Sequence, residues 1–152
     1  MTDADSPHGR TVEFAVSAVD WRGRSISVGC APSSGYVFPI GTTTVTCSAA
    51  DAGGRTASES FAVRVKGVPE QLAALRAAVV AAGLETKTTE KLTSQLDDVR
   101  KQLEATRTTA VCGGLSDFVD AVQRQSGKSS AAADADAFVA GAQRMRAVLS
   151  CA

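Results

Sequence analysis

Hydrophobic side chains alternate with polar or small ones in the first half of the chain. The alternation covers residues 12–18, 26–30, 45–49 and 61–65, as in VEFAVSA and FAVRV. A period of two residues is typical of strands that have one face on a core and the other face in water. The spacing of these segments and of the turns between them predicts a β-sandwich over residues 11–67.

An internal repeat falls in two of the expected turns. SAVDWRGR at 17–24 and SAADAGGR at 48–55 share the form S-A-x-D-x-x-G-R, and each follows an expected strand. The two aspartates, Asp20 and Asp51, are suited to bond a turn backbone, and the glycine to take a positive φ. The alternative role is calcium binding, but calcium takes about six to eight oxygen ligands and each loop has one Asp. We therefore predict two tight turns.

From residue 69 onward the hydrophobic period becomes that of an α-helix. Pro69 suits the start of a first helix, whose apolar stripe is formed by Leu72, Leu75 and Val79, and Gly83 suits its end. Three further hydrophobic stripes follow, formed by Leu92, Leu96, Val99 and Leu103, by Val111, Leu115, Phe118, Val119 and Val122, and by Phe138, Val139, Ala142, Met145 and Leu149. The third helix is expected to end at Gly127, and the fourth to begin after residues suited to a helix N-terminus, namely Ser129, Ser130, Asp134 and Asp136. The pattern predicts an all-α four-helix bundle over 68–152, and a polar tail over 1–10.

Charge and hydropathy exclude two classes of partner. Sixteen basic residues balance sixteen acidic ones, with six of each before Gly67 and ten of each after it. Neither half has the positive excess that binding to nucleic acid or to an anionic membrane demands. No apolar run approaches the roughly 18 residues that span a bilayer, so no membrane insertion is expected. The first residues lack the pattern of a secretion signal.

Four cysteines, Cys30, Cys47, Cys112 and Cys151, favour disulfides and therefore an extracellular or cell-surface location. This location conflicts with the missing signal, so we interpret the chain as a fragment or mature part of a longer exported protein. Zinc would need closely spaced ligand pairs, and no two cysteines are closer than about 17 positions. Free buried thiols remain the alternative, and no metal or cofactor is expected. Of the three pairings, the change of period favours Cys30 with Cys47 across the sandwich and Cys112 with Cys151 between helices.

The string CAPSSGYVFPIGTTTVTC, from Cys30 to Cys47, combines a loop, a corner and a strand in fixed register. Together with VEFAVSAVD and SFAVRV, it resembles the hyalin repeat, or HYR domain, an immunoglobulin-like β-sandwich of extracellular proteins. The resemblance implies that Phe38 fills the sandwich edge and that Pro39 and Gly41 turn the chain. Such domains begin with a further strand, in whose place ten polar residues stand here. We therefore expect a sandwich truncated at its N-terminus, with an open sheet edge that permits weak self-association.

Residues 68–152 resemble, less specifically, the helical FIMAH module found at the C-terminus of bacterial surface and secreted proteins. The matching segments are AVC at 110–112, DFVDAVQRQSGK at 117–128 and FVAGAQRMRAVLSC at 138–151. The chain is rich in Ala and has eleven Arg against five Lys, which is consistent with a high-GC bacterium.

Nothing in the sequence predicts a catalytic site. The single histidine, His8, lies in the expected tail, which excludes a Ser-His-Asp or Cys-His arrangement. Acidic pairs that could act as acid and base occur on two expected helices, at Asp97 with Asp98 and at Asp117 with Asp120. Because Lys and Arg surround them, these pairs are typical of a solvated helix face. We predict that the chain is not an enzyme.

Two amphipathic aromatic residues are the candidates for a contact surface. Trp21 follows the first expected strand, and Tyr36 lies in the loop between two cysteines. Either side chain could contact a sugar or a protein. The alternative role of Trp21 is to cover the sandwich end, and that of Tyr36 is to pack the loop. The sequence predicts a non-catalytic extracellular adhesion, spacer or interaction module of a bacterial surface or secreted protein, whose protein or glycan partner is unknown. The alternative is an accessory region of an exported hydrolase whose catalytic domain lies upstream.

Overall fold

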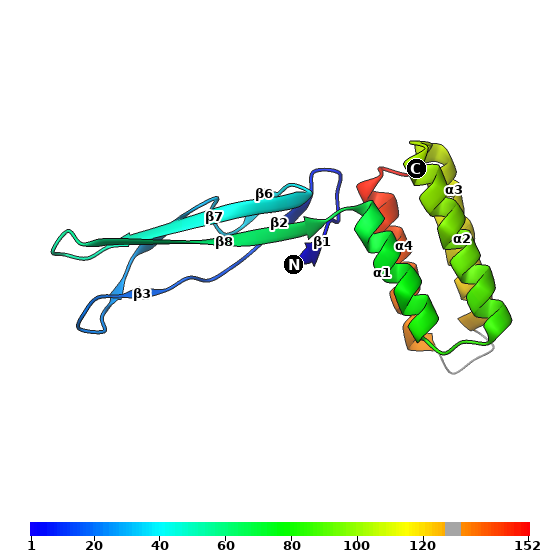
Figure 1. The fold of residues 1–152 in the computed structure, drawn as a ribbon, viewed down its shortest axis with the longest axis horizontal. Helices are drawn as coiled ribbons and strands as arrows, with labels where there is room; N and C mark the ends of the chain where they lie inside the picture. The colour runs from blue at the N-terminus through cyan, green and yellow to red at the C-terminus, as the bar shows by residue number, and fades with distance from the viewer. Residues whose placement is uncertain (127–131) are drawn as a thin grey trace.

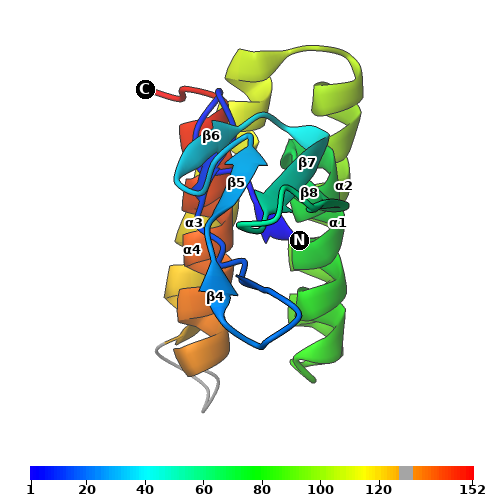
Figure 2. The same ribbon diagram turned by 90° about the vertical axis from the view of Figure 1, so that its left-hand side faces the viewer.

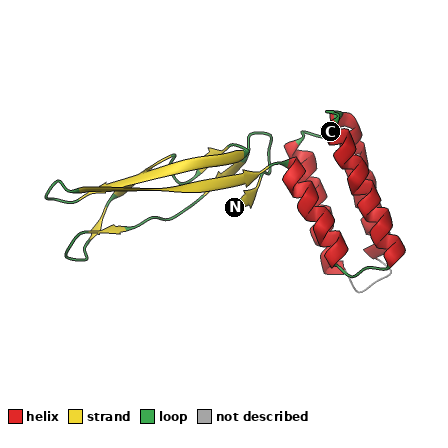
Figure 3. Ribbon diagram, viewed as in Figure 1, coloured by secondary structure: helices red, strands yellow, loops and turns green. Residues whose placement is uncertain are grey.

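Strands occupy the chain up to Lys66, and four helices follow (Figures 1 and 3). The computed structural model describes residues 1–126 and 132–152. A curled mixed β structure followed by a helical module confirms the predicted fold class. The expected helix end at Gly127 and the capping residues Ser129 and Ser130 lie outside the described residues.

The main sheet is built around one long hairpin. Its strand order is β1-β8-β7-β5, where the strands are β1 (Thr2–Asp3), β5 (Val28–Ala31), β7 (Gly41–Ala50) and β8 (Thr56–Lys66). β7 and β8 are antiparallel along their whole length, from Gly41 opposite Val65 to Ala50 opposite Thr56. Two short antiparallel pairs complete the β domain: β2 (Arg10–Val12) with β6 (Tyr36–Phe38), and β3 (Ala18–Val19) with β4 (Ser25–Ile26).

Two of the expected strands are interrupted. The alternation predicts one strand through 12–18, but β2 ends at Val12 and β3 begins at Ala18, because the chain leaves its partner β6 to pair with β4. Between them, the Phe14 N–H donates to Ser34 Oγ (2.9 Å) instead of to a strand. The expected strand 26–30 is likewise divided at Ser27, where the chain passes from β3 to β7. Side-chain alternation continues through such crossings, so the pattern does not reveal them.

The prediction of a polar tail over 1–10 is wrong. β1 runs parallel to the end of β8, Ala4 is fully buried, and the Ala4 N–H donates to Lys66 O (2.9 Å). The chain then turns between Ser6 and Gly9. Gly9 has φ +114°, and a Cβ there would lie 1.9 Å from the carbonyl oxygen of Phe38, so this close approach requires glycine. Hydrogen bonds of the backbone hold the segment in place, and such bonds do not require apolar side chains.

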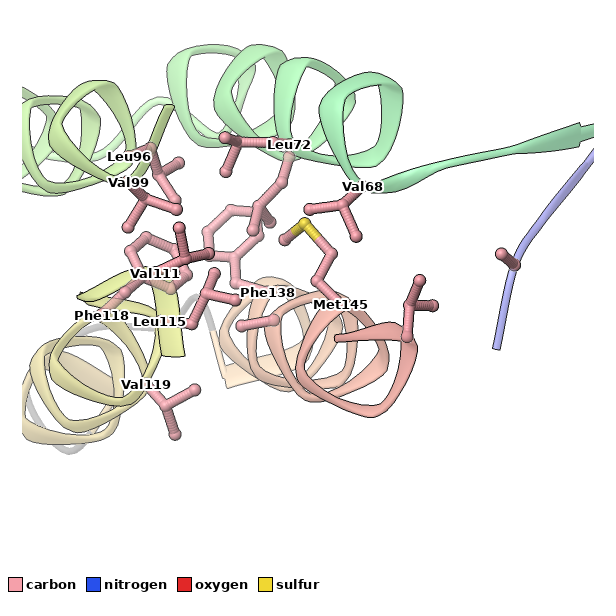
Figure 4. Packing of buried hydrophobic residues seen from close by; sticks show 14 of the residues in the cluster. Val68, Leu72, Leu96, Val99, Val111, Leu115, Phe118, Val119, Phe138 and Met145 are labelled. Carbon is pink, nitrogen blue, oxygen red and sulfur yellow. The ribbon is translucent and has the colours of Figure 1, made fainter. Parts of the chain in front are cut away.

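The helices form a closed four-helix arrangement. They are α1 (Val68–Ala81), α2 (Thr86–Glu104), α3 (Thr108–Ser126) and α4 (Ala132–Val148), and α1 packs against both α2 and α4. Pro69 lies in the first turn of α1, and Gly83 follows its end with φ +66°, as their residue types predict. Figure 4 shows the apolar side chains that fill the interior, among them Leu72, Leu96, Phe118, Phe138 and Met145. These residues belong to the stripes that the sequence predicts.

The two modules meet at a polar joint that the sequence did not predict. Gln71 of α1 is only 6% exposed, and its Nε2 donates to Ala4 O (2.9 Å) and to Lys66 O (3.0 Å). The carboxylate of Asp3 pairs with Lys66 Nζ (3.2 Å) and with Arg144 of α4. Side chains from α1 and α4 therefore hold β1 against β8.

Candidate contact surface

The two repeated sequences fold into the same loop. In the β3–β4 hairpin, Asp20 Oδ1 accepts hydrogen bonds from the backbone N–H groups of Arg22 (2.8 Å) and Arg24 (3.0 Å). In the β7–β8 hairpin, Asp51 Oδ1 accepts the equivalent bonds from Gly53 (2.9 Å) and Arg55 (2.9 Å). The glycines that follow have φ values of +76° (Gly23) and +80° (Gly54). The predicted tight turns are confirmed.

Each loop also closes with an ion pair. Arg24 Nε lies 2.8 Å from the second oxygen of Asp20, and Arg55 Nε lies 2.9 Å from that of Asp51. The backbone N–H of Arg24 lowers the pKa of Asp20 below its ordinary value, and the N–H of Arg55 does the same for the pKa of Asp51. Both carboxylates therefore stay charged and engaged at neutral pH, and neither is available to bind a cation.

Trp21 lies at the tip of the β3–β4 hairpin, at the end of the β domain opposite the helices (Figure 1). Its side chain is 69% exposed, and the guanidinium carbon of Arg22 lies 4.4 Å above the centre of its ring. This geometry is a cation–π contact. The interpretation of Trp21 as cover for the sandwich end does not fit a side chain with this exposure.

Tyr36 has a different environment. It lies in β6 opposite Val12, is 50% exposed, and its ring meets the buried Phe38 edge-on, with centroids 5.5 Å apart. Figure 2 shows β6 and the β4 strand of the other hairpin at opposite ends of the β domain in this view. The structure therefore does not bring Tyr36 and Trp21 into one site.

The β domain remains open on one side. A groove of about 330 Å³ with a mixed apolar and polar lining separates the segment Val16–Val19 from the facing side chains of β7 and β8, including Ala49 and Glu59. Nearby, Phe61 of β8 is 38% exposed and meets the ring of Phe14 edge-on at 5.1 Å. Among the described residues, β8 is paired on its outer edge only at Val65 and Lys66, where β1 lies.

The cysteines pair within each module, as predicted. Cys30 and Cys47 face each other on neighbouring strands β5 and β7, with Cα atoms 4.0 Å apart. This bridge therefore lies within one sheet, and the expectation that it crosses the sandwich is wrong. The second bridge joins Cys112 of α3 to Cys151, just beyond α4, with Cα atoms 5.7 Å apart.

The acidic pairs on the helices are neutralised by neighbouring cations or stand on the surface. Arg76 of α1 bonds both oxygens of Asp97 (2.8 and 3.2 Å), and this bonding lowers the pKa of Asp97. Asp98 lies 3.5 Å from Lys101 on the same exposed face. Asp117 lines a shallow hollow between α2 and α3 together with Asp98. Within the described residues, no three His, Cys, Asp or Glu side chains gather in a way that could hold a metal ion.

A comparison with known protein families finds a match within the β domain. Residues 7–65 match the family model of the HYR domain, which agrees with the resemblance seen in the sequence. The match ends before the helical module, so the FIMAH resemblance stays a prediction. No curated protein and no solved structure matches the chain. None of the helices in the described part of the chain is both long and apolar enough to cross a membrane.

Proposed function

We propose that this chain is a non-catalytic extracellular module of a bacterial surface or secreted protein, in which the β domain makes adhesive contacts. The observation that carries the proposal is the HYR match at residues 7–65, because HYR domains are commonly extracellular adhesion-type modules. The two disulfides support an extracellular location, since such bonds persist in oxidising surroundings. The Ala- and Arg-rich composition and the FIMAH resemblance support a bacterial source.

The exposed tip of the β domain supports the adhesive role. Trp21 belongs to the β3–β4 loop and is exposed, and this hairpin lies at the end of the β domain away from the helices, where a partner can reach it without meeting the bundle (Figure 1). A large, rigid aromatic side chain offers contact area at a low cost in conformational entropy. The helical module is joined to the β domain through Gln71 and Asp3, at the end away from this tip, and leaves the tip uncovered (Figure 1).

The bonding of the acidic side chains supports a non-catalytic role. Asp97 is held in its charged form by Arg76, whereas a general acid or base needs a pKa near the working pH. The carboxylates of Asp20 and Asp51 are bonded within their own loops.

Self-association belongs to the same proposal. The outer edge of β8 from Thr56 to Arg64 has no strand partner in the described structure, and the groove beside it exposes apolar side chains. An open edge of this kind offers unpaired backbone groups to a strand of another chain. We expect the contact between two copies to be weak because charged side chains such as Glu59 and Arg64 lie along the edge and oppose close pairing.

An attachment assay tests the adhesive role. Beads that carry the whole chain are expected to attach to immobilised extracellular polysaccharides or matrix proteins, and Trp21→Ala to reduce attachment without lowering the unfolding temperature. Tyr36→Ala should also reduce attachment, but with a lower unfolding temperature, because its ring packs on Phe38. The control is Val80→Ala, which removes an exposed apolar side chain from α1. If the unchanged chain attaches to none of these surfaces, or if the control loses as much attachment, the proposal is wrong.

A further inference from the structure

The repeated loop shows which of its residues the fold needs. In both copies, Asp, Gly and Arg make the same backbone bonds and the same ion pair. The two positions between Asp and Gly differ, with Trp21 and Arg22 in one loop and Ala52 and Gly53 in the other. Because Ala and Gly support the same geometry, the loop does not require the tryptophan and the arginine.

The arginines of the two loops also differ in whether a carboxylate neutralises them. Arg24 and Arg55 are each neutralised by the aspartate of their own loop. Within the described residues, Arg22 has no carboxylate within ion-pair distance, and its contact is with the ring of Trp21. The tip therefore presents an uncompensated cation beside an indole that is largely exposed to solvent.

We propose that Trp21 and Arg22 form a binding site for the uronic-acid units of an anionic polysaccharide. The exposed indole suits the C–H face of a sugar ring, and the guanidinium fork suits a carboxylate on that ring. The inference rests on the proposed function, because it assigns a ligand class to the contact-making tip.

The shape of the tip favours a glycan over an acidic peptide. A stable protein interface buries about 1,200–2,000 Å² around an apolar centre. The loop at residues 20–24 is narrow and has Trp21 as its large apolar side chain. The exposed Val19 beside it belongs to β3 and lines the groove together with Val16 and Ala49. A single flat ring face with one cation is enough for one sugar unit.

Trp21 is the only tryptophan in the chain, so its fluorescence reports on the site directly. Titration of the whole chain with polygalacturonate oligomers is expected to change this fluorescence, with neutral dextran giving no change. Added salt should weaken the response, since the ligand is an anion. No response to polygalacturonate would overturn the proposal.

The double variant Trp21→Ala with Arg22→Gly gives the first loop the residues of the second. Its binding to polygalacturonate, measured by retardation in gels that contain the polymer, is expected to fall by about tenfold or more, because a charge-assisted bond and a ring contact are lost. Its unfolding temperature should stay unchanged. Arg22→Ala is compared with Arg124→Ala, which removes the same charge from an exposed site on α3.

The outcomes separate the ligand class from the proposed function. Equal losses in Arg22→Ala and Arg124→Ala would overturn the site, because only net charge would then matter. Polyglutamate that binds as tightly as polygalacturonate would overturn the glycan assignment in favour of an acidic peptide. A chain that ignores polygalacturonate but attaches to another surface through Trp21 refutes only this inference, whereas a chain that attaches to nothing refutes the proposed function.

Discussion

Replacement of Gln71 tests the joint between the modules. In Gln71→Ala the carbonyl oxygen of Ala4 loses the side-chain donor that lies 2.9 Å away, while Lys66 O keeps its bond from the Ala4 N–H. Ala4 is fully buried in the unchanged chain, and the alanine side chain that replaces Gln71 has no donor to offer its carbonyl oxygen. A buried polar group left without a partner costs about 1–3 kcal/mol.

This cost sets the expected size of the effect. For a chain of this length it corresponds to an unfolding temperature lower by roughly 2–12 °C. Gln71→Glu should be worse, because a carboxylate cannot donate and would face the two carbonyl oxygens directly. Thermal unfolding followed by circular dichroism measures the loss, and hydrogen exchange at the Ala4 amide locates it, with exchange expected to be about 5- to 150-fold faster.

The matched control is Gln143→Ala on the exposed surface of α4, for which we expect a change within about 0.5 kcal/mol. If Gln71→Ala and Gln143→Ala unfold at the same temperature, and the Ala4 amide exchanges at the same rate in both, the reasoning about the joint is refuted.

Three further predictions follow from the disulfides, the repeated loops and the open edge. Replacement of both Cys112 and Cys151 by Ser removes a bridge that spans 39 residues, so the free energy of unfolding of the bundle, measured in urea, should fall by roughly 3–4 kcal/mol. An unchanged urea midpoint would contradict this prediction. The folded-state pKa of Asp51 is lowered, so its stabilisation is complete above the unfolded pKa and is lost as pH falls below about 4 through the folded value. In Asp51→Asn the free energy of unfolding should therefore fall less steeply below about pH 4 than in the unchanged chain. Equal slopes of the two curves against pH would contradict this prediction. Sedimentation over a wide concentration range should show weak self-association of the chain, and Ala62→Lys on β8 should reduce this association. A monomer at every concentration would contradict the prediction.

The periodicity of the sequence was sufficient for the long elements of the fold. The alternation at 45–49 and 61–65 lies within β7 and β8, and the helical stripes contain most of the buried residues of the bundle. The N-terminal segment escaped prediction because two paired residues and one buried alanine are too short to show a period. The crossings at Glu13–Ser17 and at Ser27 escaped because they change the backbone partner without changing the side-chain pattern.

The candidate site was only partly predictable for a similar reason. The repeat S-A-x-D-x-x-G-R identifies both turns, since an Asp side chain and a glycine with positive φ act locally. The contact of Arg22 with Trp21 lies at the positions where the two copies of the repeat differ, and this difference was the available signal. Gln71 gave a weaker signal, as a single polar residue beside the apolar stripe of α1, because its partners come from residues distant in sequence.

The parallel pairing of β1 with β8 has a mechanical consequence. Tension applied between Asp3 and Cys151 loads the β1–β8 hydrogen bonds in shear and passes through the contact between Asp3 and Arg144 into α4. The disulfide between Cys112 and Cys151 then spreads the load to α3. The β3–β4 tip lies off this line of force (Figure 1). Tension applied along this path would therefore leave the geometry of the β3–β4 tip unchanged.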